Sequence, residues 1–85
     1  MSNIYYTAHT FSNYYNLLSN EIKPLQNSLN FQLSLPENIR DNYLISILTE
    51  KINTLNSIKS EIKTFPSNIV YLVSDSDHTD YSILR

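Results

Sequence analysis

Apolar residues recur at helical spacing along most of this chain, and this periodicity limits the fold more than any other feature of the sequence. In the first part of the chain they follow one another after three or four residues, in the series Ile4, Ala8, Phe11, Tyr15, Leu18, Ile22, Leu25 and Leu29. Such a stripe lies along one side of an α-helix and requires a facing helix to cover it. Pro24 does not shift the phase of the series, so we expect one helix that is kinked near Pro24.

A second helical pattern opens at Ser34, Pro36 and Glu37. These residue types suit the N-cap, the first turn and the capping-box position of a helix, in that order. The apolar positions that follow keep helical spacing as far as Phe65, where Pro66 is expected to end the helix. Because few residues separate the two patterns, we expect the helices to fold back on each other as an antiparallel hairpin.

The composition agrees with a helical hairpin that needs a partner. The chain has no glycine, the residue that tight hairpin turns and phosphate-binding loops favour, and no cysteine for disulfides or thiolate-bound metals. A domain of 85 residues buries only about 60% of the surface that its unfolded chain exposes. We therefore predict an all-α fold, an antiparallel two-helix hairpin that completes a helical bundle by association with a second copy or with another protein.

The residues after this hairpin have a different character. We divide the chain into a helical hairpin, residues 1–66, and a C-terminal tail, residues 67–85. The β-branched residues in the run from Ile69 to Val73 favour a strand, but so short a run is also compatible with a helical turn. A strand there would pair with residues 4–7, and this βααβ arrangement is the main alternative to the all-α hairpin.

No group of residues indicates an enzyme. No Cys or activated Ser has a credible base near it in the sequence, and surface or partly packed positions explain His9 and His78 better than catalysis. The segment from Asp75 to His78 lacks the glycine and the terminal glutamate of a calcium-binding loop, so it indicates a solvated acidic tail. We expect no catalytic residue, no cofactor, no metal and no small-molecule substrate.

The charge balance excludes further classes of partner. Six basic and eight acidic residues leave no basic stripe that would neutralise phosphates, so nucleic acid is not an expected partner. The sequence begins without the charged and apolar regions of a secretory signal, and no stretch reaches the roughly 18 apolar residues of a membrane span. We expect a cytoplasmic protein, with secretion that needs no signal peptide as the alternative.

With catalysis, metal binding and nucleic-acid binding not expected, protein binding is the expected activity. Tyr5, Tyr6, Tyr14 and Tyr15 lie close together, and tyrosine is common at interfaces, although a partly exposed rim around a core tyrosine explains them equally well. The residues predicted to bind the partner belong to the two apolar stripes: Phe11, Tyr15, Leu18, Ile22, Leu44, Leu48, Leu55, Ile58 and Ile62.

Tyr71 and Asp75 form the pattern Tyr-x-x-x-Asp beyond the predicted hairpin. This arrangement resembles the export signal of small helical-hairpin proteins of type VII secretion systems, which include the Trp-x-Gly family and the accessory proteins of LXG toxins. The resemblance implies a hairpin that pairs with a helical region of a larger protein and displays Tyr71 and Asp75 to the secretion machinery. The chain has no Trp and no Gly for the turn, and this favours the accessory or adaptor branch.

The expected function is therefore a non-enzymatic protein-interaction module, either a small helical adaptor or targeting factor or a substrate of a type VII-like secretion system. Two alternatives stay open. One is a self-assembling hairpin subunit of a secretion needle or rod, which would form filaments as its concentration rises. The other is a small inhibitor of phage or antitoxin type, which would bind one enzyme tightly and would not be exported.

Overall fold

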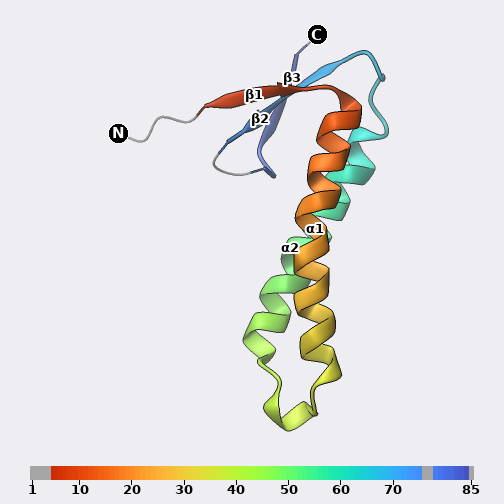
Figure 1. Ribbon diagram of the computed structural model, residues 1–85. Helices are drawn as coiled ribbons and strands as arrows, with labels where there is room; N and C mark the ends of the chain where they lie inside the picture. Colours follow the sequence, from red (N-terminus) through yellow and green to blue (C-terminus); the bar gives the residue numbers. More distant parts are fainter. Residues whose placement is uncertain (1–4, 76–77, 85) are drawn as a thin grey trace.

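The computed structural model describes residues 5–75 and 78–84 and contains a long helical hairpin that carries a small antiparallel sheet at its open end (Figure 1). The elements in chain order are β1 (Tyr6–His9), α1 (Phe11–Ser34), the 3₁₀ turn η1 (Glu37–Ile39), α2 (Asn42–Ile62), β2 (Val70–Ser74) and β3 (Tyr81–Leu84). The molecule measures 51 × 34 × 15 Å and has a radius of gyration of 15.4 Å. A compact chain of this length would have a radius of about 12 Å, so the molecule is elongated.

The prediction of an all-α fold is wrong, because both ends of the chain form strands and the protein is α+β. β2 lies in the centre of the sheet and pairs antiparallel with β1 on one side and β3 on the other. The register places Tyr71 of β2 opposite His9 of β1 and Ile83 of β3. The βααβ alternative placed strands at both ends of the chain, whereas β3 was not predicted at all.

The first helix begins later than its apolar stripe suggested. Ala8 lies in β1, and Ile4, the first member of the stripe, lies outside the described residues. Thr10 ends the strand and caps the helix, because its Oγ1 accepts a hydrogen bond of 3.3 Å from the backbone N–H of Asn13. From there α1 runs without a break through Pro24 to Ser34, which confirms that this segment forms one helix.

The predicted start of the second helix is also wrong. The side chain of Ser34 is not its cap, because Ser34 Oγ donates a hydrogen bond of 2.6 Å to the carbonyl of Phe31 at the end of α1. Glu37 belongs to η1, a single 3₁₀ turn within the connection. The cap is Asp41, whose Oδ1 accepts a hydrogen bond of 3.0 Å from the backbone N–H of Leu44.

The core lies between the sheet and the parts of both helices that adjoin it, and we call this part of the molecule the head. Its buried members are Tyr14, Leu18, Leu55, Ile58, Ile62, Ile69, Tyr71 and Val73. The rings of Tyr14, Tyr71 and Tyr81 pack together, with centroids 5.3 to 5.9 Å apart. The Tyr71 hydroxyl donates to the carbonyl of Ile62 at 3.3 Å. Burial, together with a hydrogen bond to Glu61, raises the pKa of Tyr81 to about 12, so its hydroxyl is neutral near pH 7.

Replacement of the cap tests where α2 begins. Asp41→Ala is expected to lower the free energy of unfolding by about 1 kcal/mol, because the N–H of Leu44 then loses its acceptor. Asp41→Asn keeps an acceptor and is expected to retain most of that stability. Glu37→Ala is the matched control and should change stability by less than about 0.5 kcal/mol. Urea unfolding followed by circular dichroism measures all three, and a larger loss in Glu37→Ala would contradict the assignment.

Candidate functional site

The part of the hairpin that projects beyond the head, which we call the arm, has an almost uncharged surface. Residues 24–36 and 42–49 include no charged side chain. The charges at this end of the molecule are confined to the turn, at Glu37, Arg40 and Asp41. The buried centres of protein interfaces are depleted of charged residues in the same way. The arm is thus a candidate surface for protein binding.

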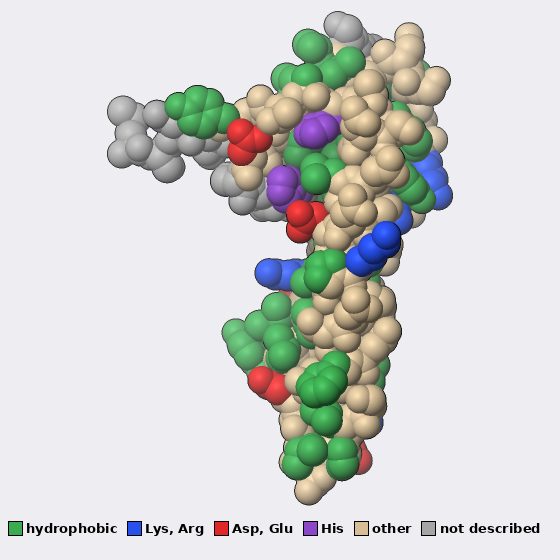
Figure 2. Space-filling view, viewed as in Figure 1, with side chains coloured by type: hydrophobic (Ala, Val, Ile, Leu, Met, Phe, Trp, Pro, Cys, Tyr) green, Lys and Arg blue, Asp and Glu red, His purple; other side chains and the backbone are tan. Residues whose placement is uncertain are grey.

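Four large apolar side chains are exposed toward the end of the arm, and we call them the apolar tip. They are Phe31, Leu33, Ile39 and Tyr43, with exposed fractions of 62, 48, 59 and 76%. They come from the end of α1, from η1 and from the start of α2. Figure 2 shows hydrophobic side chains gathered along this lower part of the molecule. Exposed apolar residues that are grouped in this way are candidates for an interaction site.

The turn that carries the apolar tip is held by side-chain hydrogen bonds. Arg40 donates from Nε to the carbonyl of Leu35 and from Nη2 to that of Leu33, each at 2.9 Å. The backbone N–H of Asp41 donates to Oε1 of Gln32, also at 2.9 Å. These bonds satisfy carbonyls at the end of α1 and tie the connection to the helix. The tip side chains therefore project from a well-supported turn, which lowers the entropy that binding would cost.

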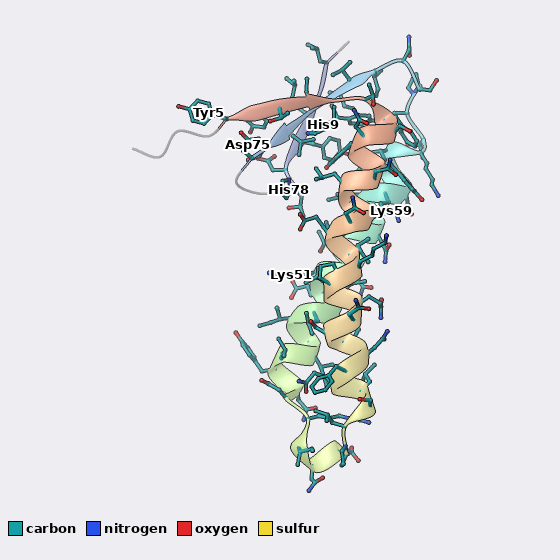
Figure 3. All side chains as sticks on the ribbon, viewed as in Figure 1. Tyr5, His9, Lys51, Lys59, Asp75 and His78 are labelled. Atoms are coloured by element: carbon teal, nitrogen blue, oxygen red, sulfur yellow. The ribbon has the colours of Figure 1, made fainter. Side chains whose placement is uncertain are left out.

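A cleft of about 630 Å³ lies where the arm meets the head. Leu25, Ile47 and Leu55 provide its apolar lining, and polar residues from both helices and from the β2–β3 connection surround them. One of these, His78, lies with its Nε2 3.6 Å from Oε1 of Glu21. Figure 3 shows His78 and Lys51 on the same side of the hairpin, above and below this position. The volume is typical of sites that enclose a small ligand or a group of side chains.

The apolar stripes that were predicted to bind the partner are largely used within the chain. Five of the nine residues are buried: Leu18, Leu48, Leu55, Ile58 and Ile62. The other four are half-buried: Phe11, Tyr15, Ile22 and Leu44. Tyr15 is further engaged by two cations, since Nζ of Lys59 and Nζ of Lys63 lie 4.6 and 5.2 Å from the centre of its ring. The interaction with Lys63 lowers the pKa of Tyr15.

Tyr71 and Asp75, the proposed export motif, differ in accessibility. Tyr71 is fully buried in the head, whereas Asp75 is exposed just beyond β2. Oδ1 of Asp75 accepts a hydrogen bond of 2.6 Å from Oγ1 of Thr7, and its backbone N–H donates to the carbonyl of Tyr5 at 2.9 Å. A protein that binds this surface would contact Asp75 directly. The buried side chain of Tyr71 would contribute only by stabilising the strand that precedes Asp75. A role of the pair in export stays a prediction.

Within residues 5–75 and 78–84, no group of three or more His, Cys, Asp and Glu side chains is arranged to hold a metal ion. Two residues of the acidic segment, Ser76 and Asp77, lie outside this description. His9 is half-buried in β1 and faces Tyr71 across the sheet. Neither of the helices in the described part of the chain is long and apolar enough to cross a membrane.

The apolar tip was missed because three of its four members fit helical stripes. Leu33 has the spacing to widen the stripe of the first helix, and Ile39 and Tyr43 have the spacing to begin that of the second, whereas Phe31 belongs to neither stripe. The signal that separates them is the absence of charge on both sides of the turn, which is unusual for the exposed end of a hairpin. No protein-family model, curated protein or solved structure matches this chain.

Proposed function

We propose that this protein is a non-enzymatic protein-interaction module that binds a helical partner through its arm. The observation that carries this proposal is the apolar tip, four exposed large apolar side chains on a turn that Arg40 and Gln32 hold in place. Exposing grouped apolar side chains to water is unfavourable, and such a group is usually covered by another molecule.

The energetics favour a partner that runs along the arm over a short peptide that meets the tip alone. Full burial of one large apolar side chain contributes about 1.5–3 kcal/mol. Association costs about 4–15 kcal/mol before any contact is counted. The four tip residues, already partly covered, offset only part of that cost. The half-buried residues farther along the arm supply the rest, among them Leu29, Leu44, Ile45 and Ile47.

An adaptor or substrate of a type VII-like secretion system is one specific form of this proposal. It is supported by the helical hairpin and by the exposed carboxylate of Asp75 next to the sheet. In that form the arm binds the larger protein while Asp75 is presented at the opposite end of the molecule (Figure 3).

A photoreactive phenylalanine analogue placed at Tyr43 tests the proposed function in the cells that express the protein. Tyr43 is 76% exposed and aromatic, so the analogue preserves the surface that we expect the partner to cover. The expected result is a defined covalent adduct on a denaturing gel. The matched control carries the analogue at Asn56, an exposed position of α2 at the level of the head, and should give no such adduct.

The same experiment with Phe31→Ser and Ile39→Ser added distinguishes binding from chance collision. Both side chains are largely exposed, so these substitutions should leave the circular dichroism spectrum unchanged. We expect the Tyr43 adduct to fall to the level of the Asn56 control. An adduct that persists, or equal labelling from Tyr43 and Asn56 in the unaltered chain, would refute binding through the tip.

A further inference from the structure

We infer that the partner of the arm is a second copy of this chain, and that the apolar tip of each copy lies in the cleft of the other. This inference rests on the proposed function, because it names the protein that the arm binds. The tip is exposed and apolar, and the cleft of about 630 Å³ offers it three apolar side chains, Leu25, Ile47 and Leu55. The rest of the cleft is lined by Glu21, Glu50, Lys51, Thr54, His78 and Thr79.

A single two-fold axis places the tip of each copy in the cleft of the other. The tip and the cleft lie on the same arm, and Leu25 precedes Leu33 by eight residues of α1, a rise of about 12 Å. An axis perpendicular to the arm and midway between these levels places each tip at the level of the other copy's cleft. The two arms then run antiparallel, and their four helix segments form a bundle around the half-buried apolar residues.

The distribution of charge favours a second copy over a different protein. The arm is free of charged side chains on either side of its turn, so a second copy brings only the charges of that turn, Glu37, Arg40 and Asp41, to a cleft that is lined by charges of both signs, Glu21, Glu50 and Lys51. At the ends of the antiparallel arrangement, Glu37 of one copy approaches Lys51 of the other. Both are exposed, and neither forms an ion pair among the residues that the structure describes.

Light scattering on a sizing column is the first part of the test. We expect twice the chain mass of 9.9 kDa. Ile39→Glu should raise the dimer Kd at least about 100-fold, because it brings a carboxylate into an apolar contact. Asn56→Glu, which adds the same charge at the level of the head, should leave the Kd unchanged. Circular dichroism confirms that both variants fold.

Engineered cysteines are the second part, and the chain offers no natural thiol to interfere. We expect Ile39→Cys and Thr54→Cys proteins, when mixed and oxidised, to give a disulfide-linked heterodimer, because position 54 lines the cleft. Ile39→Cys mixed with Asn56→Cys is the matched control and should remain uncrosslinked. Ile39→Cys alone should also remain single, because the two tips lie at opposite ends of the bundle that the two arms form.

The outcomes separate this inference from the proposed function. A monomer at every concentration overturns the dimer, and the Tyr43 adduct then has the mass of a different protein if the arm is nevertheless a binding surface. A dimer in which Ile39→Cys crosslinks to itself, or in which the Thr54→Cys pair does not form, overturns the tip-in-cleft contact. A dimer with the predicted mixed disulfide and a Tyr43 adduct of twice the chain mass supports both.

Discussion

Tyr71→Ala is expected to lower the free energy of unfolding by about 3–5 kcal/mol. Tyr71 is fully buried on the central strand, where its ring packs against Tyr14 and Tyr81 and its hydroxyl donates to the carbonyl of Ile62. A chain of 85 residues has a total stability of roughly 4–13 kcal/mol. The expected loss is therefore a large share of the total stability, and urea titration followed by circular dichroism measures it.

Two further substitutions identify the source of this loss. Tyr71→Phe keeps the ring and removes only the hydrogen bond to the Ile62 carbonyl, so it should cost about 0.5–1.5 kcal/mol. Tyr5→Ala removes an equally large side chain that is 66% exposed, and it should change stability by less than about 0.5 kcal/mol. A Tyr71→Ala protein as stable as the Tyr5→Ala protein would show that this side chain is not in the core.

This result bears on how the export motif is tested. Failure of a Tyr71→Ala protein to leave the cell follows from unfolding alone, so it carries no information about a signal. Asp75→Ala is the informative change, since its side chain is exposed and its one hydrogen bond within the described residues is that from Thr7. Thr7→Val removes the same hydrogen bond and keeps the carboxylate, which makes it the control for loss of that contact.

Pro24→Ala is expected to raise the free energy of unfolding by about 2–3 kcal/mol. Pro24 lies inside α1 and is exposed, so its ring contributes no core contact, and it cannot donate a backbone hydrogen bond to the carbonyl of Asn20. Proline in a helix interior costs about 3 kcal/mol relative to alanine. Greater freedom of the unfolded chain offsets about 0.4–1 kcal/mol of the gain. Thermal unfolding provides the measurement.

Ser28→Ala is the matched control for this prediction, because it lies one turn farther along the same helix and is exposed as well. It should stabilise the protein by less than about 0.7 kcal/mol, the usual difference in helix propensity. If Pro24→Ala lowers stability, the proline must serve a contact of the arm, and the dimer Kd of this variant then shows whether a distorted arm is required for association.

The helical hairpin could be predicted from the sequence because its information is local. Spacings of three and four residues persist on both sides of Pro24, and a stripe that keeps its phase across a proline indicates one helix. The ends of the helices were harder to predict. Ser34 and Asp41 are both good caps by residue type, and the choice between them depends on the 3₁₀ turn that lies between.

The sequence offered the pairing of β1 with β2 only as an alternative, because the information for that pairing is not local. Ala8 fits the helical stripe of α1, yet it pairs with Leu72 far along the chain. The absence of glycine was also overinterpreted, since it argues against two-residue hairpin turns, whereas β2 and β3 are joined by residues 75–80. Nothing in the four residues from Tyr81 to Leu84 distinguishes an edge strand from a tail.

The position of the candidate site could not be predicted from the sequence. The conclusion that an apolar helical surface binds a protein came from periodicity, which cannot tell a stripe buried within the hairpin from one left exposed. Ile58 and Ile39 fit the same pattern, yet one is 8% and the other 59% exposed. The difference arises from the length of the hairpin, which extends beyond the sheet that covers its other end.

The pairing of β1 with β2 also sets an order of events for folding. Tyr6 lies opposite Ser74, so β1 cannot join the sheet until the intervening chain has closed a long loop. The helices and their turn need only neighbours in sequence, and contacts of that kind form in microseconds. We therefore expect the arm to form first and the complete sheet last. Before β2 packs on the helices, the side chains of Tyr14 and Ile62 are not yet buried.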